Sequence, residues 1–293
     1  MSSTTLKIAI VWDWGLAEWA NPLVWDGLKA AMKKIGETHQ VDWYLGGKYP
    51  PDNYYDWILP WGVGSIPFNY KIQEYHSRKA LLCAGHPQDT ANFDKFEAIF
   101  VESPAVQEQI RAKGFRSVLA FGTDVSYFQP EKLPKIIDCF YPATFSAWKR
   151  QDLFSVVGDR GLACGTVQPD GLHLLNICRS RGVYVIDGLV PTALVSRMYN
   201  MSRCVVITSW HGSERTLLEA MSCNIPVVIT KDNILTCSLA NEEVTQVEPT
   251  KAAIMQGVRM VLEKEVNTRL FIVQNYSHHI YADQIMEVLN EQR

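Results

Sequence analysis

Short apolar runs alternate along this chain with longer segments in which apolar residues return every three or four positions. The first run spans Leu6 to Val11, and helical spacing follows from Glu18 to Ile35. An apolar run bounded by turn residues predicts a buried strand, whereas the longer repeat predicts an amphipathic helix. Strands that alternate with helices predict β-α-β units and a parallel sheet that is buried on both faces.

The alternation predicts two domains of this kind. A break at Phe128 to Lys135, with two prolines, several charges and no periodicity, is typical of a linker. Before the break, strands are expected at residues 41–45, 57–59, 80–84, 98–101 and 118–121, and a helix at 105–113. After it, strands are expected at residues 136–141, 162–167, 183–186, 204–208 and 226–230, helices at 148–156, 171–181, 192–199 and 214–223, and mainly helical structure from residue 251 onward. The expected fold is α/β, with two Rossmann-like doubly wound parallel sheets facing each other across a cleft.

Length and composition agree with a globular protein of two domains. The chain has 293 residues, about two domains at roughly 150 residues each. Hydrophobic residues make up 47% and charged residues 20%, which excludes a disordered chain. The net charge of -3 gives no electrostatic basis for binding nucleic acid or an anionic membrane. We also expect no transmembrane segment and no secretory signal, since no apolar stretch approaches the roughly 18 residues that span a bilayer.

The cysteines indicate a reducing compartment. There are 7 of them, most lie in apolar segments, and none forms a C-x-x-C pair. This usage favours buried reduced thiols and a cytoplasmic location over a disulfide framework or a zinc site. The neighbouring His278 and His279 would point about 100° apart on a helix, so they are poorly placed to share a metal ion.

The most informative stretch runs from Ser209 to Thr230 and has the pattern strand, glycine turn, helix, turn, strand. The turn brings the backbone N–H groups of Gly212, Ser213 and Glu214 to a helix N-terminus, which favours a bound phosphate. Glu219, further along the helix, could accept hydrogen bonds from a ribose diol. A well-capped helix with a surface glutamate explains the same residues about equally well, because such helices occur in every fold of this type.

The stretch from His211 to Val228 resembles the signature of the retaining glycosyltransferases of family 4, roughly E-G-F-G-L-x-L-L-E-A-M-A-C-G-x-P-V-V. The resemblance implies the GT-B fold and a ribose-binding role for Glu219, which matches the second acidic position. His211 replaces the first acidic residue, which contacts the donor hexose in the family. Asn224 replaces the usual glycine of the turn, and asparagine also accepts the left-handed backbone conformation.

Three further stretches extend the resemblance over residues 122–289. Gly122 to Pro130 resembles the segment N-G-V-D-x-x-x-F-x-P that ends the family's first domain, and Tyr276 to Leu289 resembles a C-terminal helix that crosses back onto that domain. The implied divisions are an acceptor-side domain at 1–130, a nucleotide-sugar domain at 131–275 and the crossing helix at 276–293. The chain is short for the family, which favours a viral or phage origin.

Phe145 to Phe154 resembles the family's loop that carries a diphosphate-binding lysine, here Lys149. The family's nearby arginine is replaced by Thr144, so Arg150 or Arg215 is the expected substitute. No D-x-D motif occurs, and the resemblance implies that the leaving diphosphate is neutralised by these side chains and by helix amides, without a metal ion.

The N-terminal half carries weaker signals. The family has a glycine-rich loop near the donor phosphates where this chain has Gly15, preceded by Trp12, Asp13 and Trp14. Indole faces stack on sugars, so these three residues are expected on the acceptor side, although packing in the core is the commoner use of a tryptophan. His86 ends another strand, where the resemblance implies a catalytic histidine near the reacting sugar; a lone histidine is more often structural.

These observations predict a retaining hexosyltransferase that uses a nucleotide-diphosphate sugar and a glycan or glycoprotein acceptor. Mannose from GDP-mannose is expected first, and glucose or N-acetylglucosamine from a UDP-hexose next. His86 and His211 are expected to contact the hexose, and the nucleotide base is expected beside Asp187, Leu189 and Val190. No G-x-G-x-x-G follows the first strand and neither a G-x-S-x-G nor a P-loop motif occurs, which weakens dehydrogenase, hydrolase and P-loop hypotheses.

Two alternatives stay open. A sugar-nucleotide epimerase of the same fold would use a donor without an acceptor. A catalytically inactive module that binds nucleotide sugars or glycans is favoured by His211 and Thr144, the two departures from the family pattern. Formation of a homodimer also stays open.

Overall fold

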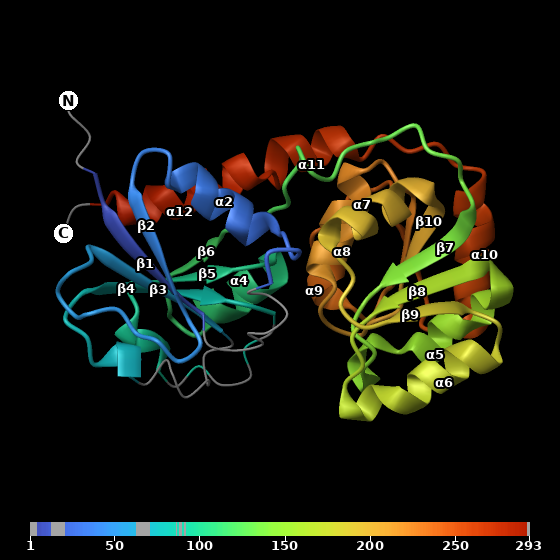
Figure 1. The fold of residues 1–293 in the computed structure, drawn as a ribbon, viewed down its shortest axis with the longest axis horizontal. Coiled ribbons are helices and arrows are strands. Elements are labelled where there is room, and N and C mark those ends of the chain that lie inside the picture. Colours follow the sequence, from blue (N-terminus) through green and yellow to red (C-terminus); the bar gives the residue numbers. More distant parts are fainter. Residues whose placement is uncertain are drawn as a thin grey trace. The chain divides into compact units, whose positions relative to one another are not determined.

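The computed structural model describes residues 5–12, 21–62, 71–85, 87, 90 and 92–291. The chain forms two compact units, each with its own parallel sheet (Figure 1). Unit 1 comprises Met1–Gly122 and His278–Arg293, and unit 2 comprises Thr123–Ser277. The segment from Phe128 to Lys135 has no helix or strand, and Phe128 itself is fully buried in unit 2.

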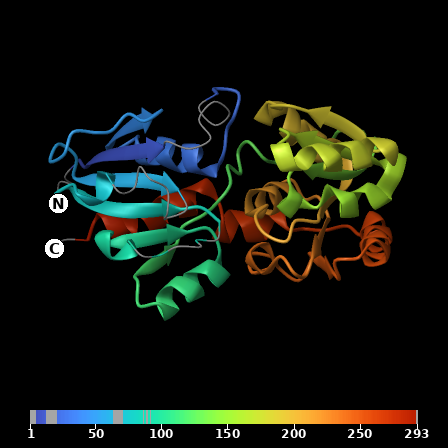
Figure 2. The ribbon, with the colours of Figure 1, turned by 90° about the horizontal axis from the view of Figure 1, so that it is seen from below.

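Unit 1 contains a six-stranded parallel sheet in the order β2-β1-β3-β4-β5-β6. Its strands are β1 (Lys7–Trp12), β2 (Gln40–Leu45), β3 (Trp57–Gly62), β4 (Arg78–Cys83), β5 (Ala98–Val101) and β6 (Ser117–Leu119). The apolar runs become buried strands because both faces are covered: Ile8 and Ile10 pack in one core cluster and Ala9 and Val11 in another. Figure 2 shows the strands of this sheet in a row, with colours that pass from blue to green.

Helices α2 (Gly27–Ile35) and α12 (His278–Leu289) pack side by side in unit 1 (Figure 1). Among its described residues, this unit also contains η1 (Phe93–Lys95), α4 (Pro104–Ala112) and helical residues at 71–73. The predicted helix from Glu18 is wrong over the described residues 21–26, which are not helical. The Asp26 side chain accepts a hydrogen bond from the Lys29 backbone N–H, so it caps the helix immediately before Gly27.

The last helix is tied to the sheet of unit 1. Tyr281 and Ile285 of α12 lie in the same core cluster as Ile8. The Trp57 indole N–H donates to the backbone carbonyl of Leu289 at 3.0 Å. This helix therefore completes the core of unit 1, although it is the last element of the chain.

Unit 2 contains a second six-stranded parallel sheet, in the order β12-β11-β10-β7-β8-β9. Its strands are β7 (Ile137–Pro142), β8 (Gly161–Gly165), β9 (Tyr184–Asp187), β10 (Ser202–Ile207), β11 (Val227–Thr230) and β12 (Thr245–Val247). The first strand of this unit lies in the middle, between β8 and β10, so the sheet grows first to one side and then to the other. Figure 2 shows the result, with the green and yellow elements above the orange and red ones.

The helices of unit 2 follow its strands closely. They are η2 (Ala147–Lys149), α5 (Gln151–Phe154), η3 (Ser155–Arg160), η4 (Pro169–Gly171), α6 (Leu172–Ser180), α7 (Thr192–Met201), α8 (Glu214–Ser222), α9 (Ile234–Cys237), α10 (Lys251–Leu262) and α11 (Arg269–Asn275). One prediction needs correction: the helix expected at 148–156 is broken into three short pieces. The first break occurs because Arg150 has a left-handed backbone (φ 50, ψ 49), and after Phe154 the chain continues as a 3-10 helix.

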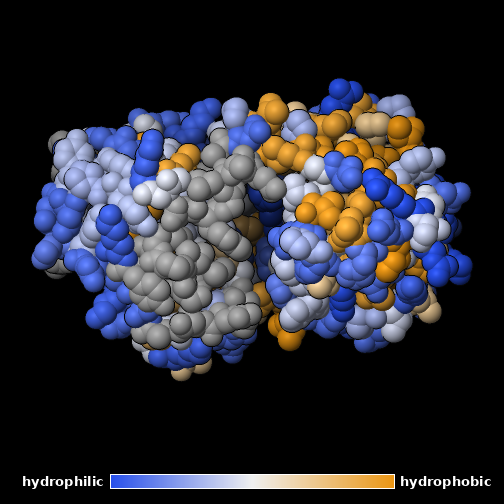
Figure 3. Space-filling view, turned by 60° about the horizontal axis from the view of Figure 1, so that its bottom comes forward, coloured by the Kyte–Doolittle hydropathy of each residue, from blue (hydrophilic) through white to orange (hydrophobic). Residues whose placement is uncertain are grey.

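All seven cysteines are free thiols, as predicted, and six of them are buried. None of the helices in the described part of the chain has the length and apolar character needed to cross a membrane. Unit 2 exposes several large apolar side chains, among them Ile136, Tyr184 and Leu194, and Figure 3 shows apolar residues gathered on the face of this unit that it presents.

Candidate functional site

The candidate site lies where two loops of unit 2 meet. Strands β7 and β10 pair in parallel, with Cys139 opposite Cys204 and Phe140 opposite Val205. The sheet reverses its direction of growth at this pair, and ligands of doubly wound folds bind at such a reversal, outside the carboxyl ends of the strands. The loop after β7 carries Lys149 and the loop after β10 carries the glycine turn.

Hydrogen bonds tie the two loops together. The Trp210 backbone N–H donates to the Trp148 carbonyl at 3.1 Å. The Thr208 hydroxyl donates to the Lys149 carbonyl at 3.0 Å, and the Tyr141 hydroxyl donates to the same carbonyl at 3.1 Å. The backbone of Lys149 is therefore positioned from both strands.

The side chain of Lys149 lies on the glycine turn. Its Nζ donates to the Ser213 hydroxyl oxygen at 2.9 Å. A Cβ atom placed on Gly212 would lie 2.9 Å from the same Nζ, and Gly212 has a φ of +70, which favours glycine. The structure thus brings together the lysine and the glycine turn that the sequence places 63 residues apart (212 minus 149).

The turn is held by side chains behind it. The Gly212 carbonyl accepts hydrogen bonds from the Ser209 hydroxyl at 3.1 Å, from Asn233 Nδ2 at 2.9 Å and from the Thr236 hydroxyl at 2.9 Å. Asn233 Nδ2 also donates to Ser209 Oγ at 2.9 Å. Together these hydrogen bonds fix the conformation of the turn. This network was not predicted from the sequence, because Asn233 caps α9 and Thr236 lies within that helix, both after β11.

The N-terminus of α8 lacks the usual side-chain cap. Ser213 has a left-handed backbone (φ 80) and its hydroxyl makes no capping bond; it contacts Lys149 and Ser209 instead. The first amides of a helix have no partner within the helix, and the helix dipole makes this end positive. An ammonium group beside such an end creates a favourable place for an anion.

Glu214, the first residue of α8, is a second ionisable group at this turn. It is only 4% exposed, and its Oε1 has no hydrogen-bond partner in the described structure. Burial raises the pKa of its carboxyl group, and the charge of Lys149 counteracts part of that rise. An ionised Glu214 would oppose an anion at the turn, whereas a protonated one would not. The sequence predicted a role only for the backbone N–H of Glu214, not for its carboxyl group.

Arg150 and Arg215 were the expected arginine substitutes at the diphosphate. The Arg150 guanidinium makes four hydrogen bonds to the unit itself: Nε to the Thr208 carbonyl, two to the Asp232 carboxylate and one to the Thr230 hydroxyl. These contacts give Arg150 a bracing role between loops, and its role at the diphosphate stays a prediction. Arg215 Nε lies 3.6 Å from Glu219 Oε1, one helical turn further along, and its side chain is exposed.

Glu219 is buried, and the alternative of a well-capped helix with a surface glutamate is therefore wrong. The residue is only 6% exposed. Its Oε2 accepts a hydrogen bond from the buried Tyr199 hydroxyl at 3.0 Å. Burial, together with the nearby carboxylate, raises the pKa of Tyr199 far above its ordinary value, which keeps this hydroxyl a donor.

His211 is held between two indoles. Its ring stacks on Trp148, with centroids 5.8 Å apart and an interplanar angle of 9°. It meets Trp210 edge-on, with centroids 4.4 Å apart, and Trp210 is 52% exposed. This aromatic group was not predicted from the sequence. The sequence does contain an indication of it, because Trp148 directly precedes Lys149 and Trp210 directly precedes His211.

The predicted base-binding residues lie at the end of β9 and directly after it, and β9 is separated from β7 by β8. Asp187 forms an ion pair with Arg179 at 3.1 Å, and both side chains are about half exposed. Leu189 is exposed and Val190 is half-buried. Thr144 Oγ1 lies 3.3 Å from Thr166 Oγ1. None of these contacts tests binding of a base or a diphosphate, so both stay predictions.

Most of the predicted N-terminal site residues cannot be placed. Asp13, Trp14, Gly15 and His86 lie outside the described residues, and their roles stay predictions. Trp12 is buried and stacks on Trp61, with ring centroids 3.7 Å apart. In the ranges that the structure describes, no three His, Cys, Asp or Glu side chains are grouped so that they could hold a metal ion.

Comparison with known proteins places this geometry in a wider fold class. No family model matches the chain, and a search of curated proteins finds no match. Solved structures do match along the whole chain. A glycosyltransferase from Rickettsia africae ESF-5 has a TM-score of 0.72 and 11% identity over 98% of both chains. The trehalose 6-phosphate synthase from Burkholderia multivorans has a TM-score of 0.73 and 8% identity, also over 98% of both chains.

A third similar structure is HepE from Anabaena in complex with UDP-glucose. Its TM-score is 0.69 and its identity 14%, over 97% of this chain and 99% of HepE. At these identities the likeness concerns the fold. With two Rossmann-like units, each built on a six-stranded parallel sheet, the chain has the GT-B fold.

Proposed function

We propose that the chain is a retaining glycosyltransferase that transfers a hexose from a nucleotide-diphosphate sugar to a glycan or glycoprotein acceptor. The contact of Lys149 Nζ with the Gly212–Ser213 turn, at the reversal point of the unit 2 sheet, carries this proposal. An ammonium group and a helix N-terminus converge there, which suits a pyrophosphate. The shared fold with glycosyltransferases gives independent support.

The donor is placed by the groups around the turn. The diphosphate lies on Lys149 and on the backbone N–H groups of Gly212, Ser213 and Glu214. The ribose diol binds the Glu219 carboxylate, which the Tyr199 hydroxyl orients at 3.0 Å. The base lies beside the loop after β9, and the hexose lies near His211, whose ring is held by Trp148 and Trp210.

The reaction proceeds by departure of the nucleoside diphosphate through an oxocarbenium-like state. The acceptor hydroxyl attacks the anomeric carbon from the face that the diphosphate leaves, which retains the configuration. Fixed positive charge stabilises the departing diphosphate, and such preorganised charge is commonly the largest catalytic contribution. Lys149 and the turn amides supply that charge here, so the proposal requires no metal ion.

The hexose remains the open part of the proposal. GDP-mannose is the donor suggested by the family resemblance, whereas the similar structure of HepE contains UDP-glucose. The test is to incubate the protein with GDP-mannose, UDP-glucose and UDP-N-acetylglucosamine, each with and without a glycan extract. Mass spectrometry of the products and assay of the released nucleoside diphosphate then identify the donor and the acceptor.

The proposal predicts acceptor-dependent release of nucleoside diphosphate from one donor and an α-linked product. A change in the donor sugar without any acceptor would instead identify an epimerase. Calorimetric binding of a donor with no turnover under any condition would identify an inactive binding module, the hypothesis that His211 and Thr144 favour. Absence of binding by every donor would contradict all three.

A further inference from the structure

Unit 1 contains a cavity of about 530 Å³ between helix α2 and the edge strand β2. Sites for small molecules commonly have roughly 300–1,000 Å³. One wall comes from Trp25, two residues before α2, and from Lys29 and Lys33 of α2, four residues apart on one face of the helix. The other wall comes from alternate residues of β2 and includes Trp43.

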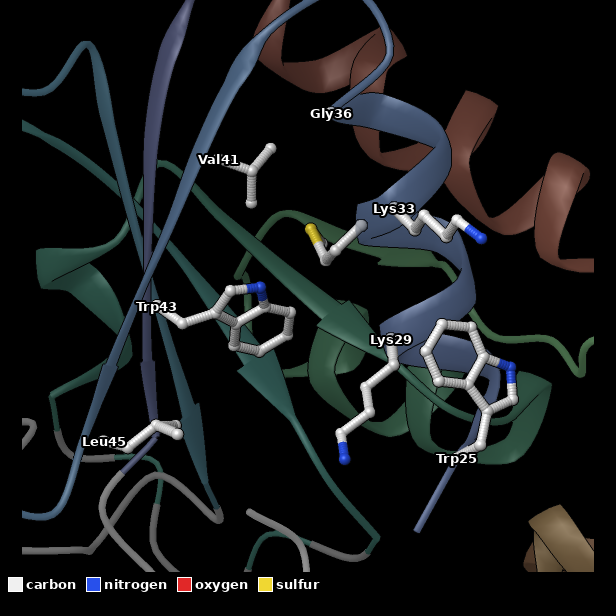
Figure 4. A pocket seen from close by; sticks show the side chains of 8 residues that line it. Trp25, Lys29, Lys33, Gly36, Val41, Trp43 and Leu45 are labelled. Atoms are coloured by element: carbon white, nitrogen blue, oxygen red, sulfur yellow. The ribbon is translucent and has the colours of Figure 1, made fainter. Parts of the chain in front are cut away.

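Figure 4 shows how these side chains lie. The Trp43 indole points from β2 toward α2, and in this view the Lys29 side chain lies between it and the Trp25 indole. Lys29 Nζ donates to the Val24 backbone carbonyl at 2.6 Å, which fixes the ammonium at the cavity. Lys33 Nζ lies 5.9 Å from the centroid of the Trp25 ring.

The walls select for an apolar ligand body. Besides the two indoles, the cavity is lined by Met32, Val41 and Leu45. None of the described lining residues has a hydroxyl, carboxamide or carboxylate side chain. A sugar placed there would bury hydroxyl groups away from side-chain acceptors, which is unfavourable. A hydrocarbon or aromatic body has no such cost and gains from contact with the indoles.

The charges select for an anion. Both charged residues among the described lining residues are lysines, whereas the chain as a whole has a net charge of -3. The positive charge here is thus a local feature that the composition of the chain does not explain. Two ammonium groups beside an apolar cavity complement a ligand with an anionic head and an apolar body.

We propose that this cavity binds a small anionic amphiphile, such as the phosphate monoester of an apolar alcohol. The ligand's body lies against Trp43, Val41 and Leu45 on the β2 wall, and its head group contacts Lys29 and Lys33. The inference concerns unit 1 alone and does not depend on the proposed transferase activity.

The test uses three monomeric probes in calorimetric titrations with the full chain, below the micelle concentration. Octyl phosphate has both the head and the body, octyl glucoside has the same body with a neutral sugar head, and inorganic phosphate has the head alone. The expected result is that octyl phosphate binds about tenfold or more tightly than either of the others. Equal binding of octyl glucoside would contradict the proposal.

Two variants connect binding to the cavity. Replacement of both Lys29 and Lys33 by methionine keeps the aliphatic stems and should weaken octyl phosphate binding about tenfold. Lys34→Met is the matched control on the same helix, because Lys34 pairs with Glu37 at 2.6 Å and does not line the cavity. Val41→Trp, which fills the cavity and keeps both lysines, should abolish binding.

A comparison of vesicles with the monomeric probe distinguishes a binding pocket from a membrane-binding surface. Vesicles of phosphatidylcholine with an anionic phospholipid are titrated in parallel with octyl phosphate. Binding to vesicles but not to the monomeric probe would overturn the proposal and indicate a surface patch. Unchanged octyl phosphate binding by either the lysine double variant or Val41→Trp, with native circular dichroism, would overturn it as well.

Discussion

Lysine side chains mark two regions of this molecule, one in each unit, and their surroundings differ. In unit 2, Lys149 lies on a polar turn with a hydroxyl, a helix N-terminus and a network of side-chain donors behind it. In unit 1, Lys29 and Lys33 border a cavity of indoles and aliphatic groups. The same cationic group is thus suited to a pyrophosphate in one setting and to an amphiphilic anion in the other. What surrounds the charge decides which anion fits.

The largest expected effect concerns Lys149. Lys149→Ala removes the ammonium on the Gly212 turn and should lower turnover by roughly 10²–10³-fold, the usual loss for one preorganised charged or hydrogen-bonding group. The measurement is kcat with the best donor. Lys231→Ala is the control, since Lys231 follows β11 of the same sheet but pairs with Glu248 at 2.9 Å and is exposed. Equal effects of the two variants would show that Lys149 contributes only general charge.

The next prediction separates Lys149 from its neighbour Arg150. Arg150→Met breaks the bracing contacts with Asp232, Thr208 and Thr230 and should lower the free energy of unfolding by about 2 kcal/mol, as for other partly buried hydrogen-bonded charges. Lys149→Ala should change stability much less. Denaturant unfolding checks both variants. A loss of activity without a loss of stability in Arg150→Met would contradict the bracing role and support the predicted role of Arg150 at the diphosphate.

The ion pair between Arg150 and Asp232 also predicts how the stability of the protein changes with pH. Hydrogen bonds and the charge of Arg150 outweigh burial and lower the pKa of the Asp232 carboxyl below its ordinary value. A lowered pKa in the folded state stabilises the protein above the unfolded pKa, and this stabilisation is lost as pH falls through the folded pKa. Asp232→Asn should therefore lose stability at neutral pH and show a weaker loss on acidification than the unchanged protein.

A pair of glycine variants tests the close approach at the turn. Gly212→Ala and Gly46→Ala face the same backbone strain, because their φ values are +70 and +71. Each should cost about 1 kcal/mol of stability. Only Gly212→Ala places a methyl group 2.9 Å from Lys149 Nζ, whereas nothing lies within 4 Å at Gly46. Calorimetry should show about tenfold weaker donor binding for Gly212→Ala alone. Unchanged donor affinity would mean that the turn does not hold the diphosphate.

The smallest expected effect comes from Glu214. Burial raises the pKa of its carboxyl group, so the group becomes ionised as pH rises through that raised pKa. The new negative charge opposes the diphosphate, and donor affinity should therefore fall several-fold with rising pH. Glu214→Gln should bind the donor more tightly at high pH and with a flatter profile. His211→Gln is the parallel variant. If donor affinity becomes independent of pH in His211→Gln but not in Glu214→Gln, the pH effect does not come from Glu214.

The sequence predicted the fold well where periodicity was strong. Strands such as β1 and β5 appear within about one residue of their predicted positions, because a short continuous apolar run bounded by turn residues is typical of a buried strand. β12 and α9 were not predicted, because elements of three and four residues are too short to show a hydrophobic periodicity. It also mistook residues 148–156 for one helix, because a left-handed Arg150 has no signature in an apolar pattern.

The candidate site was predicted in part, for a related reason. The glycine turn and Lys149 follow strand ends, and local sequence together with family resemblance found both. The supporting contacts come from Asp232, Asn233 and Thr236, in the loop after β11 and in α9, which only the folded sheet brings near. The buried carboxyl of Glu214 was missed because exposure depends on tertiary packing, and a glutamate in the first turn of a helix is ordinarily at the surface.

The central claim is that Lys149 holds the second phosphate of a nucleotide. Calorimetry of a nucleoside diphosphate and the matching monophosphate, each with the unchanged protein and with Lys149→Ala, tests it most directly. The account predicts that the unchanged protein prefers the diphosphate about tenfold or more and that Lys149→Ala loses most of this preference. If both proteins prefer the diphosphate to the same extent, Lys149 does not contact that phosphate and the proposed site is wrong.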